Sequence, residues 1–242
     1  MVSRDNSHYS YCLMLPILLV HGAWHNGAGY SRLISSLASR GITATTVELS
    51  SAAASDKPIG DMYQDAQLVS TAVDSIGSDC YVLAHSYGGL PVTEGLAGKK
   101  NVRGIIYLTA FVLDVGETLF AACGSVDPVW WQRNADNTRL TANNPLNIFY
   151  NTTDSATGEE VAASLRTQSI SSFTQPITKT AWKEIDSTYI ICEKDNAIPV
   201  FAQEAMSQRC TRVLRMDTDH SPFLCAPEEL AELIMRLQLD RD

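Results

Sequence analysis

The residues around Ser86 have the types and spacing that make a serine hydroxyl reactive. The run Ala84-His85-Ser86-Tyr87-Gly88-Gly89 directly follows the short apolar segment Cys80-Tyr81-Val82-Leu83. A buried strand that leads through small-x-Ser-x-Gly into a helix is typical of a nucleophile elbow, a strained turn that exposes the serine hydroxyl. Ala84 and Gly88 are small enough for such a turn, although glycine is more common than alanine at the first position. A plain Gly-rich turn between a strand and a helix would also fit these residues.

The nucleophile needs a base and an acid, and the chain offers both after later strands. An imidazole must remove the serine proton during attack, and His220 is the candidate, in an irregular loop over residues 217–222. A carboxylate must orient that imidazole and stabilise its charged form, and Asp195 is the preferred candidate. Three other acids lie near strand ends and remain alternatives: Asp114, Asp217 and Asp219.

Backbone N–H groups are expected to stabilise the oxyanion that forms during attack. The N–H of Tyr87 opens the helix after Ser86, and the N–H of Ala23 lies in the turn His21-Gly22-Ala23-Trp24 after the first strand. Loss of one such donor typically costs about 3–4 kcal/mol of transition-state stabilisation. We expect three aromatic side chains to line the substrate pocket, although the last two also suit a structural core: Trp24, Trp130 and Trp131.

Composition restricts the class of protein. The chain has 242 residues, 45% of them hydrophobic and 19% charged, which is ordinary for one globular domain. A net charge of −9 gives no electrostatic reason to expect nucleic acid or an anionic membrane as a partner. Six cysteines without metal-ligand spacing predict neither a zinc site nor a disulfide framework, and they favour a reduced, cytoplasmic location.

Strands and helices alternate along most of the chain. This order predicts an α/β fold with a mostly parallel central sheet flanked by helices. We expect strands over residues 15–20, 42–47, 81–85, 102–109, 188–192 and 212–216. We expect helices over residues 30–40, 61–76, 89–97, 199–208 and 227–239. Residues 1–12 are polar and aperiodic and are expected to form a flexible arm, with a single domain over residues 13–242.

The alternation is interrupted over residues 113–182. This stretch holds many aromatic residues and is too long for a structureless loop inside a compact domain. We interpret it as an inserted, mostly helical cap. The predicted functional residues all follow strands, where ligands gather in open α/β sheets. Their order along the chain, Ser then Asp then His, is the order of the α/β-hydrolase arrangement.

Several longer motifs carry a resemblance to a known family. They are His21-Gly22-Ala23-Trp24, the Ser86 elbow, Tyr107-Leu108-Thr109-Ala110-Phe111, Cys192-Glu193-Lys194-Asp195-Asn196-Ala197-Ile198-Pro199 and Asp219-His220-Ser221-Pro222-Phe223-Leu224. The chain resembles, from about Leu15 onward, the bacterial branch of the α/β-hydrolases that includes carboxylesterases and pyrethroid-type hydrolases. Plant methylesterases and hydroxynitrile lyases are more distant relatives.

The resemblance implies a reaction and its residues. It implies cofactor-free, metal-free hydrolysis of small, fairly hydrophobic carboxylic esters through an acyl-enzyme, and it suggests a homodimer. It assigns Ser86, Asp195 and His220 as the catalytic triad, and it assigns the N–H groups of Ala23 and Tyr87 as the oxyanion hole.

Other functions stay open on the same scaffold. A lactone, a thioester or a xenobiotic ester could be the substrate, and a non-catalytic ligand receptor could keep the triad. A hydroxynitrile lyase is disfavoured, because similar lyases carry Thr in place of Gly22 and Lys in place of Ser221. A nicotinamide-dependent oxidoreductase is disfavoured by glycine spacing that does not match G-x-G-x-x-G.

Overall fold

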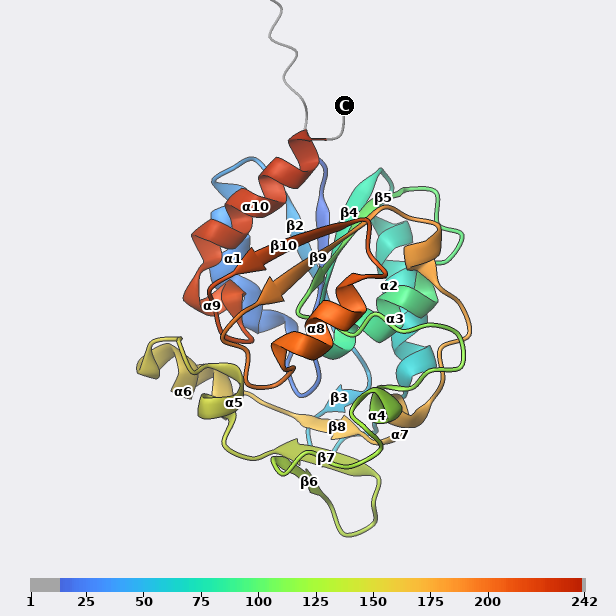
Figure 1. Cartoon of the computed structure of the whole chain (residues 1–242), viewed down its shortest axis with the longest axis vertical. Helices are drawn as coiled ribbons and strands as arrows, with labels where there is room; N and C mark the ends of the chain where they lie inside the picture. The colour runs from blue at the N-terminus through green and yellow to red at the C-terminus, as the bar shows by residue number, and fades with distance from the viewer. Residues whose placement is uncertain (1–13, 241–242) are drawn as a thin grey trace, which may run out of the picture.

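A six-stranded sheet forms the centre of the protein (Figure 1). The structure is a computed structural model and describes residues 14–240, so the arm predicted over residues 1–12 lies outside the described residues. The strands are β1 (Ile17–Val20), β2 (Ala44–Val47), β4 (Cys80–His85), β5 (Val102–Leu108), β9 (Ser187–Cys192) and β10 (Arg212–Met216).

The sheet order is β10-β9-β5-β4-β1-β2, and every neighbouring pair of strands is parallel. The predicted parallel sheet is therefore confirmed. Every residue of β1 and β4 is buried, because helices cover both faces of the sheet, which explains the continuous apolar runs in the sequence. Since the strands are parallel, all their carboxyl ends lie at one edge, and the segments that follow them meet there.

Helices pack on the two faces of this sheet. On one side (Figure 1), α1 (Ser31–Ala38) packs against α10 (Pro227–Leu239), with α9 (Pro222–Cys225) beside them. On the other side, α2 (Met62–Ile76) packs against α3 (Gly89–Gly95), and α8 (Val200–Ser207) contacts β9. The described part of the chain also has three short 3₁₀ helices: η1 (Gly27–Tyr30), η2 (Ser86–Gly88) and η3 (Ala181–Lys183). Within residues 14–240, no helix has both the length and the apolar character needed to span a membrane.

The ends of α2 follow from local hydrogen bonding. The Asp61 carboxylate accepts from the Gln64 N–H, and the Gln64 side chain accepts from the Asp61 N–H, which forms a capping box. The helix stops at Gly77, whose φ of 70° is accessible to glycine without strain. These signals explain why the sequence located this helix to within one residue.

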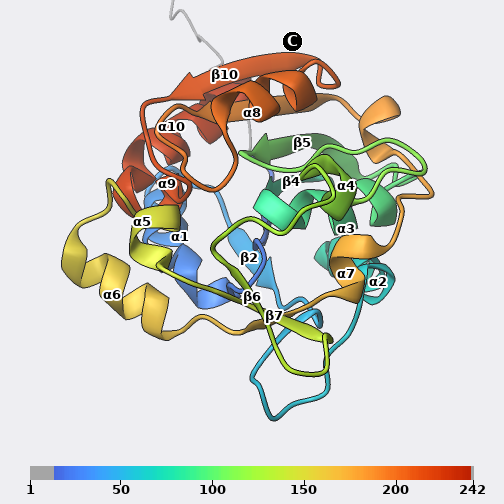
Figure 2. The same ribbon diagram turned by 60° about the horizontal axis from the view of Figure 1, so that its bottom comes forward.

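The residues between β5 and β9 form a layer at the carboxyl edge of the sheet (Figure 2). Its helices are α4 (Leu119–Ala122), α5 (Pro145–Phe149), α6 (Ser155–Ala163) and α7 (Ser171–Thr174). Its strands are β6 (Trp131–Arg133), β7 (Arg139–Ala142) and β8 (Thr167–Ser169). These strands join β3 (Ala52–Ala53) in an antiparallel sheet of order β3-β8-β7-β6.

The insertion therefore contains helices, as expected, and it also contains strands that the sequence analysis did not predict. Strands of three or four residues are too short to show the alternation of polar and apolar residues that identifies a strand. The partner strand β3 also lies outside residues 113–182, and local sequence cannot indicate such a long-range pairing.

At Gly95, the backbone of α3 lies close against the backbone of α2. A Cβ atom at this position would lie 2.3 Å from the backbone oxygen of Ala66. We expect Gly95→Ala to lower the free energy of unfolding by about 1–3 kcal/mol, because the two backbones would have to separate. Urea denaturation measures the change. Gly29→Ala is the matched control, since its Cβ would come no closer than 3.9 Å to Phe223, and an equal loss in both variants would contradict the explanation.

Candidate active site

Ser86 lies in a strained turn between β4 and α3. Its φ of 54° is in the left-handed region that favours glycine, a conformation that costs roughly 1–3 kcal/mol for other residues. The turn packs closely against the end of β1, because a Cβ atom at Gly88 would lie 2.8 Å from the His21 oxygen. The Phe111 N–H donates to the backbone carbonyl oxygen of Ser86 at 3.1 Å and holds the strained peptide in place. The geometry is that of the elbow predicted from the sequence.

His220 and Asp195 form a buried pair. The N–H at Nδ1 of His220 donates to Oδ2 of Asp195 at 2.7 Å, and the two residues are 1% and 7% exposed. Because a carboxylate can only accept, Nδ1 carries a proton, which leaves Nε2 as the nitrogen that can accept one. This is the tautomer that a general base requires.

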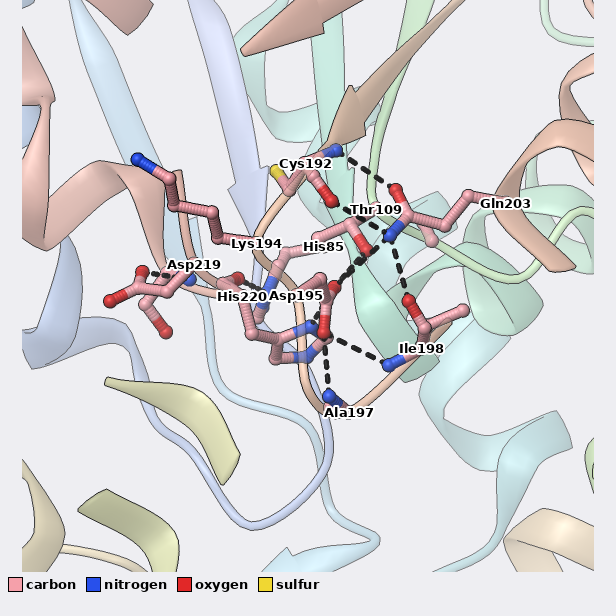
Figure 3. Close-up of polar contacts among 12 residues, drawn as sticks. His85, Thr109, Cys192, Lys194, Asp195, Ala197, Ile198, Gln203, Asp219 and His220 are labelled. Carbon is pink, nitrogen blue, oxygen red and sulfur yellow. Dashed lines mark hydrogen bonds and ion pairs between the residues drawn. The ribbon is translucent and has the colours of Figure 1, made fainter. Parts of the chain in front are cut away.

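A cage of donors fixes the Asp195 carboxylate (Figure 3). Oδ1 accepts from the N–H groups of Ala197 and Ile198 at 2.7 and 2.9 Å. Oδ2 accepts from the Thr109 hydroxyl as well as from His220. Gln203 lies behind this loop, where its amide donates to the Ile198 oxygen at 2.8 Å. The carboxylate is thereby held in one orientation toward the imidazole.

The other candidate acids do not contact the imidazole. Asp114 pairs with Lys183, and Asp217 pairs with Lys194, both at the surface and each at 2.6 Å. Asp219 is buried but points away from the His220 ring (Figure 3). Of the four acids considered from the sequence, Asp195 is the one that the fold brings to His220.

Asp219 ties the loop of His220 to the insertion. One carboxylate oxygen accepts from the Ser221 N–H at 2.9 Å. The other accepts from the N–H groups of Thr152 and Thr153, each at 2.9 Å. The position of His220 therefore depends on a segment between α5 and α6, far away in the sequence.

His85 supports the backbone of His220. Its Nε2 lies 2.8 Å from the His220 oxygen, and because that oxygen only accepts, Nε2 carries the proton. The two rings are 4.6 Å apart between centroids. His85 therefore acts as a structural donor beside the imidazole that would take the proton.

The turn after β1 brings Ala23 to the elbow. Trp24 has a φ of 64°, a strained value for a tryptophan, and its oxygen accepts from the Arg166 N–H at 2.7 Å. Among the described residues, no hydrogen bond uses the backbone N–H of Ala23 or of Tyr87. Both residues line the same cavity as Ser86.

The predicted residues meet at one cavity with an aromatic wall. Ser86, His220, Ala23 and Tyr87 line it, as do the three tryptophans predicted for the pocket: Trp24, Trp130 and Trp131. The remaining wall is largely apolar and includes Phe111, Leu119, Phe149, Phe173 and Ile198. The cavity leaves about 30 Å³ for solvent, which is room for one or two water molecules.

Three further histidines near the cavity are kept neutral by burial. Burial lowers the pKa of His25 to about 3, and it lowers the pKa values of His21 and His85 below their usual value. His25 donates from Nδ1 to the Ala23 oxygen at 2.7 Å, and its Nε2 accepts from the Tyr150 hydroxyl at 2.8 Å. These rings are hydrogen-bonded parts of the frame around His220.

Sequence reasoning missed the residues that support the site. Thr109 lies in a matched motif, and its place directly after β5 was the signal that could have identified it. Gln203 gave no such signal, because a buried polar side chain is recognised only from its partners. Asp219 was singled out only as an alternative acid for His220, and the sequence does not indicate its bonds to Thr152 and Thr153. The bond between His25 and Tyr150, which links the turn after β1 to the insertion, carries no sequence signal either.

Comparisons with known proteins agree with this architecture. The profile of a family described as "Alpha/beta hydrolase family" matches residues 17–233. An α/β hydrolase of Aspergillus novofumigatus, nvfD, is 27% identical over 239 residues, which covers 90% of this chain and 94% of that protein. A carbendazim-hydrolyzing esterase of a Nocardioides species is 30% identical over 117 residues, which covers 45% of this chain and 47% of the esterase.

Solved structures share the fold at low sequence identity. A pyrethroid hydrolase from Sphingobium faniae superposes with a TM-score of 0.81 at 23% identity, covering 94% of this chain and 98% of the other. The methylesterase MES16 from Arabidopsis superposes with a TM-score of 0.78 at 21% identity, covering 93% and 98%. At these identities the likeness establishes the fold.

The depressed pKa of His25 predicts a stability that falls in acid. Above about pH 6.5 the ring is neutral in both folded and unfolded chains, so the stabilisation is complete there. Between about pH 6.5 and 3 the unfolded chain binds a proton that the folded chain does not, so stability decreases as the pH falls. We expect His25→Gln to flatten this decrease by up to about 1.4 kcal/mol per pH unit, measured by urea unfolding at several pH values. Parallel curves for the two proteins would contradict the assignment.

Proposed function

Because this chain belongs to the α/β-hydrolase family, we propose that it hydrolyses carboxylic esters through a serine acyl-enzyme. Ser86 is the nucleophile, His220 the general base and Asp195 the group that orients the imidazole. The observation that carries this proposal is the buried bond between His220 and Asp195 beside the strained Ser86, all at one edge of the sheet.

The reaction proceeds in two halves. The Ser86 oxygen attacks the ester carbonyl while Nε2 of His220 takes the hydroxyl proton, and the carbonyl oxygen becomes an oxyanion held by the N–H groups of Ala23 and Tyr87. The tetrahedral intermediate collapses, and the imidazolium returns the proton to the departing alcohol. A water molecule then attacks the acyl-enzyme with His220 again as base, which releases the acid and restores Ser86.

The lining and the volume of the cavity restrict the class of ester that could bind. Its wall is mostly aromatic and aliphatic, which favours a small, fairly hydrophobic ester. About 30 Å³ does not accommodate such an ester without movement of wall side chains. Trp130, which is partly exposed, belongs to the insertion and is the wall residue best placed to move. The predicted homodimer and the cytoplasmic location stay predictions.

Two observations argue against cyanide-releasing lyase chemistry. A cation must stabilise departing cyanide, and the lining of the cavity, within residues 14–240, includes no lysine or arginine. Gly22 is also closely packed, because a Cβ atom there would lie 2.9 Å from both Ser86 Cβ and His85 Nδ1. A threonine at this position would disturb the elbow, so we propose hydrolysis as the single reaction.

Removal of the nucleophile tests the reaction directly. We expect wild-type protein to release p-nitrophenol from short-chain p-nitrophenyl esters, and we expect Ser86→Ala to reduce kcat by about 10⁴–10⁶-fold. Ser207→Ala is the matched control, because the hydroxyl of this buried serine donates to the Glu204 oxygen within its own helix, α8. Turnover retained in Ser86→Ala at the wild-type rate would refute the serine mechanism.

Thr109 offers a test of how Asp195 is held. Thr109→Val keeps the shape of the side chain and removes the hydroxyl that donates to Oδ2 of Asp195. We expect kcat to fall about 10-fold with little change in KM, since the imidazole loses orientation while the pocket wall is unchanged. Steady-state kinetics measures both constants. A loss confined to KM would instead mean that Thr109 contacts the substrate.

A further inference from the structure

The two turns that present the oxyanion N–H groups share one buried hydrogen-bond network. We call it the Asp65 network and define it as the side chains of Ser51, Asp65, Tyr87 and Gln168. Ser51, Asp65 and Gln168 are fully buried, and Tyr87 is 1% exposed. The network lies outside the triad, and the reaction described above leaves it without a role.

Asp65 is the centre of this network. This residue of α2 accepts from the Tyr87 hydroxyl at 2.8 Å through Oδ2, and the Ser51 hydroxyl donates to the same oxygen. Oδ1 accepts from the Ser51 N–H at 3.1 Å and from the Ser50 hydroxyl at 2.9 Å. No lysine or arginine within residues 14–240 pairs with this carboxylate, so neutral donors alone compensate its burial.

Gln168 connects the network to the turn after β1. This residue of β8 accepts from the Trp24 N–H through Oε1 at 3.1 Å. Its amide nitrogen donates to the hydroxyls of Ser51 and Ser172, each at 2.8 Å. Trp24 directly follows Ala23, so a single bonded path runs from one oxyanion turn through Gln168, Ser51 and Asp65 to the other.

Both turns need such support. Trp24 and Ser86 have φ values of 64° and 54°, so each turn would relax toward another conformation if its hydrogen bonds were lost. The N–H of Ala23 belongs to the Gly22–Ala23 peptide, directly before the peptide whose N–H binds Gln168, and the N–H of Tyr87 belongs to the peptide after Ser86. The directions of both N–H groups therefore depend on how these two strained residues are held.

We propose that the Asp65 network is a positioning device for the oxyanion hole, in which Asp65 and Gln168 fix the spacing and direction of the Ala23 and Tyr87 N–H groups. The proposal rests on the serine mechanism proposed above. Neither Asp65 nor Gln168 lines the cavity, so both act through other residues. Burial and the nearby Asp65 raise the pKa of Tyr87 well above its usual value, so its hydroxyl remains a donor at neutral pH.

The test compares variants that cut the network at two places. Gln168→Leu removes the acceptor of the Trp24 N–H, and Tyr87→Phe removes the hydroxyl that binds Asp65 but keeps the ring. Tyr107→Phe is the matched control, because its buried hydroxyl bonds to Thr93 and lies outside the network. The assays are steady-state hydrolysis of a p-nitrophenyl ester and inhibition by a trifluoromethyl ketone, which forms an oxyanion on the serine.

We expect kcat to fall about 10-fold or more in both variants with KM nearly unchanged. The inhibition constant of the trifluoromethyl ketone should rise by the same factor by which kcat/KM falls, because both report oxyanion binding. The control should match wild type. Unchanged kcat in two folded variants, or losses that fall on KM alone, would overturn the proposal while leaving the serine mechanism intact.

Amide hydrogen exchange provides a readout that needs no substrate. We expect exchange of the Trp24 N–H to accelerate at least about 10-fold in Gln168→Leu, while that of Leu83 in the middle of β4 stays the same. Tyr107→Phe should change neither. If the wild-type protein hydrolyses no ester, the proposed function fails, and this measurement still decides whether the network holds the turn. Unchanged exchange at Trp24 would overturn the inference.

Discussion

The structure of the site depends on the burial of the Asp195 carboxylate next to His220. A buried charge is tolerated only when donors surround it, and here these come from the loop after β9 and from Thr109 after β5. Because β5 and β9 are neighbouring parallel strands, their carboxyl ends deliver both sets of donors to the same place. The parallel sheet therefore places the donors that stabilise the buried carboxylate, and the carboxylate holds the imidazole in a single orientation.

Strain is the second physical feature of this edge of the sheet. Trp24, Ser86 and Thr109 all have positive φ values, and each directly or almost directly follows a strand. A strained backbone persists only where surrounding contacts over-determine it. The contacts at Ser86 and Trp24 differ in kind. The Phe111 N–H holds Ser86 by a backbone hydrogen bond, whereas Trp24 donates its N–H to the side chain of Gln168 in the insertion. The strained conformation of Trp24 therefore depends on the ordered structure of the insertion.

The sequence predicted the central sheet and its helices, and it singled out Ser86, Asp195 and His220, because these depend on local signals. Apolar runs mark the buried strands, and a motif with small residues marks Ser86. The insertion was predicted less well. The strands β6 to β8 are too short to show a period, and β8 pairs with β3 from another part of the chain. Supporting residues such as Gln203 were not foreseen, because their role comes from partners that only the fold brings near.

The insertion cannot be understood as a simple cover over a finished site. Asp219 connects residues 152–153 to the loop of His220, and Tyr150 connects to the turn of Ala23 through His25. Gln168 connects β8 to that same turn. Each link ends on one of two segments, the loop of His220 or the turn of Ala23, which hold proposed reacting groups. A change in the insertion that alters the pocket wall would therefore also alter the positions of these groups. Under the proposed function, substrate preference and rate would therefore change together, because the same segment contacts both the pocket wall and the loops of His220 and Ala23.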